Sequence, residues 1–285
     1  PGDLWLTKAN MPTAREDFAA AVVGGRLFAL GGLVDGTPIA VSHSYDPGTS
    51  RWTSRAAMPS PWAGSNGAAV INGIVYVPGG YGSSLLRTNK LFAYNAGTNT
   101  WSSKAGMPKA IGCGGSGAIG GKLWVYGTCK DDGSLEGGLY RYDPATNAWG
   151  TRIASPVQKF PAVGVVNGKL YLAGGLSEGG AIGGDLRVYD PGTGQWTSLQ
   201  PMKVARHGAT AVVLNGWIYI AGGRDGSLAP VNAVEAYNPS TGQWRTVTGM
   251  PTARSSAGAG VSNGRIYVVG GRGQLSLPTA EVYVP

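Results

Sequence analysis

Residue types that often build metal and nucleotide sites are scarce in this chain. Its 285 residues include only two cysteines and two histidines. Two cysteines are too few ligands for a structural zinc site, and His43 and His207 lie far apart in the sequence. No Walker-type or dinucleotide-binding pattern precedes an expected helix. We therefore expect no metal and no cofactor.

Long hydrophobic runs are also missing. No apolar run approaches the 18 residues that would suggest a transmembrane helix, so we expect no membrane insertion. No secretory leader is recognisable. The chain begins with Pro1 rather than Met, and we expect a processed product or a domain of a larger protein.

Acidic residues are outnumbered, with 15 Asp and Glu against 23 Lys and Arg, a net charge of +8. This balance favours acidic partners in general, but the basic residues form no runs, and we expect no nucleic-acid partner. In contrast, the chain is rich in glycine and proline, with 49 and 18 residues. Such frequent glycine and proline residues are typical of short strands joined by tight turns.

One pattern occurs six times at a pitch of 47 to 49 residues. Each repeat carries a glycine pair, except that Gly127-Thr128 replaces the third, followed by a tyrosine; in the first five repeats a tryptophan follows seven residues after the tyrosine. The pairs are Gly31-Gly32, Gly79-Gly80, Gly174-Gly175, Gly222-Gly223 and Gly270-Gly271; the tyrosines are Tyr45, Tyr94, Tyr142, Tyr189, Tyr237 and Tyr283; the tryptophans are Trp52, Trp101, Trp149, Trp196 and Trp244.

In these landmarks the whole chain resembles the kelch family, in which each repeat is one four-stranded blade of a β-propeller. The resemblance implies an all-β, six-bladed propeller that forms a single domain over residues 1–285. The expected blades are residues 9–57, 58–106, 107–154, 155–201, 202–249, and 250–285 together with the strand in 1–8. The family mostly binds other molecules, and a minority of its members are enzymes.

We name the strands of a blade a to d from the axis outward. In the first repeat, strand a is expected at residues 15–23 and strand b at 26–30, with strand c ending at Tyr45 and strand d beginning at Trp52. Strand a is expected to be narrow, because six of them converge on one axis. Small residues such as those at 64–69, 112–118 and 255–260 suit this position.

The sixth tryptophan is supplied from the other end of the chain. Trp5 lies 47 residues before Trp52. We therefore expect residues 3–7 to form strand d of the last blade and to pair with residues 279–283. Such closure places both termini in one blade, so the ring has no free radial edge at which it could open.

The d–a and b–c loops share one face of the propeller, and the b–c loops vary completely between repeats. Function usually resides on variable loops over a rigid scaffold. Eight aromatic residues fall outside the repeated positions, and four of these lie at or near this face. The eight are Phe18, Trp62, Tyr81, Phe92, Tyr126, Tyr140, Phe160 and Trp217.

Two sets of ring positions on this face hold the candidate ligand-binding residues. One set follows the glycine pairs and the other begins strand a. Kelch domains that bind acidic peptides use these positions, which by resemblance implicates Arg224, Arg272, Lys159, His207 and Ser255. Trp62, Tyr81 and Glu16 complete the predicted binding site.

Other roles for some of these charges remain open. Arg15, Arg206 and Arg254 recur at one position, which favours a structural brace over a ligand contact. Asp225 could simply pair with its neighbour Arg224.

Enzymatic chemistry is the main alternative. The histidines are badly placed for the copper site of kelch-type galactose oxidases, and the Glu, Asp and His trio that holds iron in plant specifier proteins is absent. No nucleophile can be placed beside His207 for a triad. A sugar mutarotase or epimerase is the better alternative, since kelch proteins acting on sialic acid pair an arginine with a carboxylate. The carboxylate candidates are Glu16, Asp17, Glu178 and Asp185.

The two cysteines lie on the two sides of one expected hairpin. The hairpin turns at Gly120-Gly121, which places Cys113 and Cys129 opposite one another or nearly so. Facing residues of an antiparallel pair lie within disulfide reach. We therefore predict a Cys113–Cys129 disulfide and an extracellular or periplasmic location.

The sequence thus predicts a monomeric binding module for a protein, peptide or glycan, acting through the face of the d–a and b–c loops. An anionic, sugar or acidic-peptide ligand fits the cations expected there. The alternatives are an enzyme on a small anionic sugar in the same pocket, or a purely architectural propeller.

Overall fold

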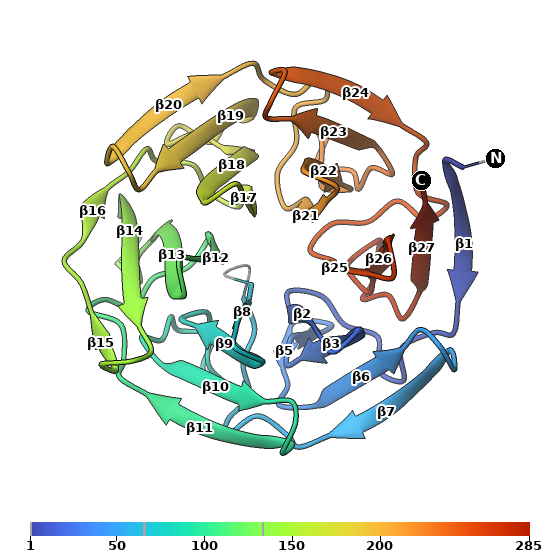
Figure 1. The fold of residues 1–285 in the computed structure, drawn as a ribbon, viewed down its shortest axis with the longest axis horizontal. Coiled ribbons are helices and arrows are strands. Elements are labelled where there is room, and N and C mark those ends of the chain that lie inside the picture. The colour runs from blue at the N-terminus through green and yellow to red at the C-terminus, as the bar shows by residue number, and fades with distance from the viewer. Residues whose placement is uncertain (1, 65–66, 133) are drawn as a thin grey trace.

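Six antiparallel β-sheets surround a central axis in the computed structural model (Figure 1). The structure describes residues 2–64, 67–132 and 134–285, so Ser65 and Asn66 of one expected small-residue segment lie outside it. Each sheet extends from an inner strand at the axis to an outer strand at the periphery. The predicted six-bladed, all-β propeller is confirmed. Within the described residues, no helix is long and apolar enough to span a membrane.

The strands follow in chain order from the inside of each blade to the outside. Blade 1 contains β2 (Ala19–Val23), β3 (Arg26–Leu30), β6 (Ser42–Asp46) and β7 (Arg51–Arg55), with the small hairpin β4 (Leu33–Val34) and β5 (Thr37–Pro38) in its b–c loop; blade 2 contains β8 (Ala69–Ile71), β9 (Ile74–Pro78), β10 (Leu91–Asn95) and β11 (Thr100–Lys104); blade 3 contains β12 (Gly115–Ile119), β13 (Lys122–Cys129), β14 (Leu135–Asp143), β15 (Ala148–Trp149) and β16 (Ile153–Ala154).

Blades 4 and 5 have the same order, whereas the outermost strand of blade 6 is the N-terminal strand. Blade 4 contains β17 (Ala162–Val166), β18 (Lys169–Leu176), β19 (Ile182–Asp190) and β20 (Gln195–Leu199); blade 5 contains β21 (Thr210–Leu214), β22 (Trp217–Ala221), β23 (Val234–Asn238) and β24 (Gln243–Val247); blade 6 contains β25 (Gly258–Ser262), β26 (Arg265–Val269), β27 (Ala280–Val284) and β1 (Leu4–Lys8).

The inner strands are narrow for the reason expected from the sequence. A Cβ atom added at Gly115 would collide with Val163 of the next blade, and one at Gly117 would collide with Val165. These inner strands begin later than predicted, however: β2 begins at Ala19 rather than Arg15. The cause is Asp17, whose φ of 49° interrupts the extended chain.

The N-terminal strand closes the ring. β1 pairs with β27, with Leu4 opposite Val284 and Trp5 opposite Tyr283. Each paired range lies one residue later than expected, and Trp5 faces its tyrosine as Trp52 faces Tyr45. The closure predicted from the repeat spacing is confirmed.

Each blade is also joined to its neighbour by a tryptophan of its outer strand. The indole N–H donates to a main-chain carbonyl in the segment that leads out of the preceding blade. The six pairs are Trp5 with Thr248 (2.8 Å), Trp52 with Ala9 (2.8 Å), Trp101 with Ala56 (2.9 Å), Trp149 with Ala105 (2.8 Å), Trp196 with Ala154 (3.2 Å) and Trp244 with Gln200 (2.7 Å). Trp5 makes the same bond as the other five, so the sixth junction is built like the rest.

The recurrent arginines are braces, as expected. Arg15, Arg206 and Arg254 are fully buried. Arg15 donates to the carbonyl of Gly31 (2.9 Å), and Arg254 donates to that of Gly270 (2.9 Å). These bonds hold the first glycine of a pair, whose positive φ leaves its carbonyl outside the sheet ladder.

Trp62 occupies the same bracing position in blade 2. Its indole N–H donates to the carbonyl of Gly79 (2.6 Å), and its side chain is 1% exposed. Trp62 therefore belongs to the core rather than to an exposed binding surface. Phe18, another of the eight unassigned aromatics, is 5% exposed.

Candidate functional site

Main-chain hydrogen bonds link the blades at one mouth of the central channel. Five residues there have φ between 49° and 63°, in the left-handed region: Asp17, Cys113, Phe160, Gly208 and Ser256. Among the described residues, five N–H···O bonds of 2.7–3.0 Å pass between neighbouring blades: Gly64 to Asp17, Asp17 to Ser256, Ser256 to Gly208, Gly208 to Phe160 and Phe160 to Cys113. We call this arrangement the lacing.

The two sets of ring positions identified in the sequence lie directly outside the lacing and pair with one another. Each residue before a lacing residue forms a β-bridge with the residue after a glycine pair. The pairs are Glu16 with Leu33, Ala63 with Tyr81, Gly112 with Cys129, Lys159 with Leu176, His207 with Arg224 and Ser255 with Arg272. We call these twelve residues the rim.

A cavity of about 140 Å³ opens at this mouth. Its walls are mostly glycine and alanine, so backbone and methyl groups set its width. The polar lining consists of Asp17, Ser116, Thr210 and Ser256, and the aromatic lining of Phe18 and Phe160. Deeper in the channel the lining becomes aliphatic, with Val22, Val163 and Val213 among the wall residues.

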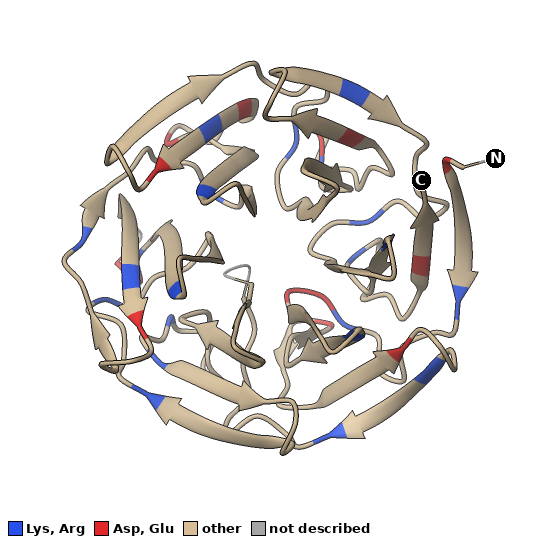
Figure 2. Ribbon diagram, viewed as in Figure 1, with Lys and Arg blue, Asp and Glu red and all other residues tan. Residues whose placement is uncertain are grey.

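Asp17 is the ionisable residue of the cavity wall. Burial and the neighbouring Glu16 carboxylate raise the pKa of Asp17 to about 6, against the opposing influence of the Ser256 hydroxyl, Arg272 and Arg224. The acidic segment that precedes β2 stands at the edge of the central opening (Figure 2). No cation lies within ion-pair distance of the Asp17 carboxylate among the described residues.

The neighbouring Glu16 carboxylate, in contrast, does have a cation as its partner. Arg272 donates to Glu16 across the junction of blades 6 and 1, at 2.5 Å. The Glu16 side chain is 4% exposed, whereas that of Arg272 is 40% exposed. Arg272 therefore neutralises a buried carboxylate, which limits the charge it can offer to a ligand.

Arg224 is held by neutral groups instead. Its Nε donates to the hydroxyl of Ser255 (3.1 Å), and one terminal nitrogen donates to the carbonyl of Leu228 (2.8 Å). Asp225 does not pair with it; the Asp225 carboxylate accepts bonds from Ser227. Ser255 is buried and positions Arg224 rather than facing solvent.

His207 and Lys159 continue the rim beside Arg224. The His207 ring lies 6.2 Å from the ring of Phe160. Burial and the charge of Arg224 lower the pKa of His207, so the imidazole is neutral at pH 7. Its Nε2 is enclosed and has no hydrogen-bond partner among the described residues. Lys159 is half-buried.

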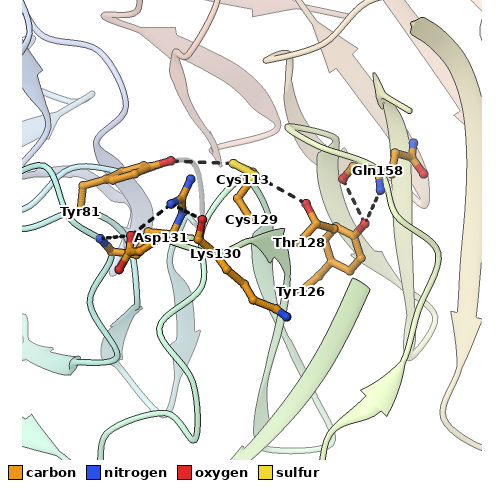
Figure 3. Close-up of a disulfide and its surroundings, with 9 residues drawn as sticks. Tyr81, Cys113, Tyr126, Thr128, Cys129, Lys130, Asp131 and Gln158 are labelled. Atoms are coloured by element: carbon orange, nitrogen blue, oxygen red, sulfur yellow. Dashed lines mark hydrogen bonds and ion pairs between the residues drawn. A yellow bond between two sulfur atoms is a disulfide. The ribbon is translucent and has the colours of Figure 1, made fainter. Parts of the chain in front are cut away.

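The opposite side of the rim contains the disulfide. Cys113 and Cys129 are bonded, with their Cα atoms 5.6 Å apart, as predicted. The residue directly opposite Cys129 is Gly112, and Cys113 reaches it from the adjacent lacing position. The Tyr81 hydroxyl points to the disulfide and lies 3.8 Å from the Cys113 sulfur (Figure 3).

Sequence reasoning missed Arg87, which fixes Tyr81. The guanidinium lies 5.3 Å from the centre of the Tyr81 ring. It also donates to the carbonyl of Lys130 (2.7 Å) and pairs with Asp131 (3.1 Å) in the next blade. Arg87 stands outside the repeated positions, so spacing alone could not reveal this role.

The other candidate carboxylates lie away from the cavity wall. Glu178 and Asp185 are exposed, and Asp185 pairs with Arg187 at 3.3 Å. Among the described residues, no group of three or more His, Cys, Asp or Glu side chains could hold a metal ion.

The b–c loops of three blades carry exposed leucines near their middle. Leu85 and Leu86 lie in blade 2, Leu228 in blade 5 and Leu275 in blade 6, and their exposure ranges from 53% to 66%. Leu85 and Leu228 have φ of 59° and 62°. A bulky side chain is rarely found in this left-handed conformation.

Together, the closed ring of blades and its loop-lined channel mouth define a six-bladed β-propeller with a site at one end of the axis. Comparison with known proteins then identifies its family. The model described as the KLHDC2/KLHL20/DRC7 Kelch-repeats domain matches residues 107–271, and the Kelch motif matches residues 14–59 and 64–108. The chain belongs to the kelch-repeat family.

Individual relatives are similar over short segments. Beta-scruin of Limulus polyphemus is 39% identical over 79 residues, which cover 27% of this chain and 8% of that protein. Human Kelch-like protein 34 is 39% identical over 77 residues, covering 27% of this chain and 12% of that protein. The chain thus aligns with only a small part of these longer relatives.

A solved structure matches nearly the whole chain. The structure of YjhT superimposes with a TM-score of 0.82 at 18% identity, covering 96% of this chain and 95% of that chain. This similarity supports the shared propeller fold.

Proposed function

We propose that this kelch propeller is a binding module for a protein or peptide segment that carries an acidic group, and that the rim is its binding face. The observation that carries the proposal is a pair of rim cations, Lys159 and Arg224, with no carboxylate partner among the described residues. An acidic group bound between them would complete charge-assisted hydrogen bonds. The enclosed Nε2 of His207 lies on the same side of the rim.

The exposed leucines favour a protein or peptide over a small molecule. They lie on loops that extend from the rim positions, since Tyr81, Arg224 and Arg272 each form a second bridge that closes the loop behind them. Apolar side chains around a polar centre are typical of surfaces that bind macromolecules. A glycan would use the cations but would gain little from these leucines.

The experiment is a comparison on arrays of acidic peptides and glycans. Labelled wild-type protein is compared with the double variant Lys159→Ala, Arg224→Ala. The matched control is Arg51→Ala, Lys104→Ala, which removes the same charge from the outer strands β7 and β11. We expect acidic peptides to be bound by the wild type and the control but not by the rim variant. Equal binding by all three proteins would refute the proposal, and exclusive binding of glycans would change the ligand class.

An enzyme acting on a small anionic sugar is a second candidate, favoured by Asp17. A carboxyl group with a pKa of about 6, facing a cavity near two arginines, suits general acid–base work near neutral pH. The interconversion of glucuronate anomers, followed by NMR line exchange, tests this candidate. Acceleration by the wild type that is lost in Asp17→Asn would support it, and unchanged exchange would count against it.

The disulfide supports a further proposal, that the protein works in an oxidising compartment outside the cytosol. Thiol titration of protein isolated from its natural source, without reductant, tests this location. Two titratable thiols would argue against it.

A further inference from the structure

The cavity inside the lacing has a feature that the rim cations do not explain. Asp17 faces a space enclosed by glycine and alanine and lacks a cation partner among the described residues, although its neighbour Glu16 has one in Arg272. A carboxylate in such surroundings is poorly solvated, which is the origin of its raised pKa. A cation brought by a ligand would supply the missing partner.

The shape of the cavity limits which cation could enter. A single water molecule needs a cavity volume of about 10–15 Å³. A cavity of about 140 Å³ therefore has room for a short chain of heavy atoms. The glycine and alanine walls leave a narrow space between short side chains, which suits a slender alkyl stem better than a bulky ligand. Phe18 and Phe160 add aromatic rings, which attract cations. These properties fit a primary ammonium group on an alkyl stem.

We propose that the cavity receives a lysine side chain of the bound partner, with its ammonium group at Asp17 and a nearby carboxylate of the same segment on the rim. The inference rests on the proposed binding of an acidic group by Lys159 and Arg224, and it adds a second, oppositely charged subsite. The rim cations disfavour a ligand that carries positive charge alone. A segment with both charges satisfies Asp17 and the rim together.

A pair of small probes isolates the ammonium group. Nα-acetyl-L-lysine carries a carboxylate and an alkylammonium, whereas Nα-acetyl-L-norleucine keeps the carboxylate and the stem but lacks the ammonium. Dissociation constants are measured by NMR titration of the full chain at pH 7.5. We expect the lysine probe to bind at least tenfold more tightly than the norleucine probe.

Variants then assign that difference to Asp17. Asparagine is similar in shape and tolerates the left-handed conformation, so Asp17→Asn should keep the backbone and abolish the preference for the lysine probe. Asp35→Asn is the matched control, because Asp35 also has a positive φ (46°) but is exposed and lies outside the cavity wall. It should retain the preference. Thermal melting of both variants shows whether they are folded.

The pH dependence gives an independent readout. The groups facing Asp17 are the Glu16 carboxylate, the Ser256 hydroxyl, Arg272 and Arg224. Protonation of Asp17 removes the charge that holds the ammonium, so affinity for the lysine probe should fall by up to about tenfold per pH unit as the pH drops below 6, until it equals the affinity for the norleucine probe. The free carboxyl group of each probe titrates near pH 3.5, outside this window, and affinity for the norleucine probe should not fall.

The possible outcomes separate this inference from the proposed function. Equal affinity for the two probes, binding of neither, or a lysine preference that survives Asp17→Asn would overturn the ammonium subsite. The array experiment with the Lys159 and Arg224 double variant would still test the proposed binding face, because its result does not depend on Asp17.

Discussion

Closure of the ring by the N-terminal strand makes a quantitative prediction about Trp5. Trp5 and Trp52 are both half-buried, and their rings lie 5.3 Å and 5.1 Å from Tyr283 and Tyr45. Each also donates one hydrogen bond of 2.8 Å to the preceding blade. Because the two sites match, Trp5→Ala and Trp52→Ala should lower the free energy of unfolding by similar amounts.

The size of the effect follows from three contributions. Loss of about 100 Å² of buried apolar surface costs about 2.5 kcal/mol. The aromatic pair adds about 1 kcal/mol, and the hydrogen bond adds about 1 kcal/mol. A loss of about 4.5 kcal/mol corresponds to a fall of roughly 9–18 °C in melting temperature for a protein of this size.

The assay is thermal and urea unfolding of both variants, followed by near-UV circular dichroism. Deletion of residues 1–8 should be more damaging still, because it removes the whole β1–β27 pairing. A change below about 1 kcal/mol for Trp5→Ala, alongside several kcal/mol for Trp52→Ala, would refute closure by β1 in solution. An unchanged melting temperature after the deletion would refute it as well.

Three further predictions concern the rim and the cavity. Arg272→Ala leaves the buried Glu16 carboxylate without its cation and should lower the free energy of unfolding by about 1–3 kcal/mol. Arg224→Ala should change the free energy of unfolding by no more than about 1 kcal/mol. Equal losses for the two variants in urea unfolding would contradict these roles. The change Cys113→Ser should lower the free energy of unfolding by only about 1–2 kcal/mol, because the loop that the disulfide closes is already a hairpin. Amide hydrogen exchange should accelerate mainly at the blade 3 rim, and acceleration throughout the blade would contradict a local role of the disulfide. The pKa of Asp17 in the folded state, about 6, exceeds its value in the unfolded chain, so folding is less favourable above pH 6 than near pH 4. Asp17→Asn should therefore raise the melting temperature at pH 7.5 and have little effect at pH 4. An equal effect at both pH values would exclude the ionisation of Asp17 as the cause.

The Arg272 salt bridge changes one expectation drawn from the sequence. The sequence predicts Arg224 and Arg272 together as ligand-binding residues. Replacement of Arg272 would also leave a buried carboxylate without its cation, because Glu16 is 4% exposed. Lys159 and Arg224 are therefore the cleaner pair for testing the rim.

Features set by the repeat could be predicted from the sequence, and features set by exceptions to it could not. The blade order, the Trp5 closure and the disulfide all follow from spacing, because strand pairing converts sequence position into spatial position. The role of Trp62 was missed because a tryptophan there does the work of an arginine elsewhere. Arg87 was missed because its partners lie in the next blade, at positions no repeat specifies.

The place of Asp17 on the cavity wall depends on backbone conformation rather than on spacing. Its positive φ separates it from the strand and places it in the lacing. Sequence analysis included Asp17 among four possible carboxylates but could not choose between them. Only the contacts between blades distinguish it from Glu178 and Asp185.

The lacing has a consequence for how such a site can diversify. Its links join main-chain atoms, so the aperture of the channel does not depend on which side chains surround it. Positions immediately outside it, such as Lys159 and His207, can exchange charge, size or aromaticity while the opening keeps its diameter. The left-handed positions themselves tolerate few residue types, and a β-branched residue at Asp17 or Ser256 would strain two blades at once. Selectivity can thus be altered one residue at a time around an unchanging frame.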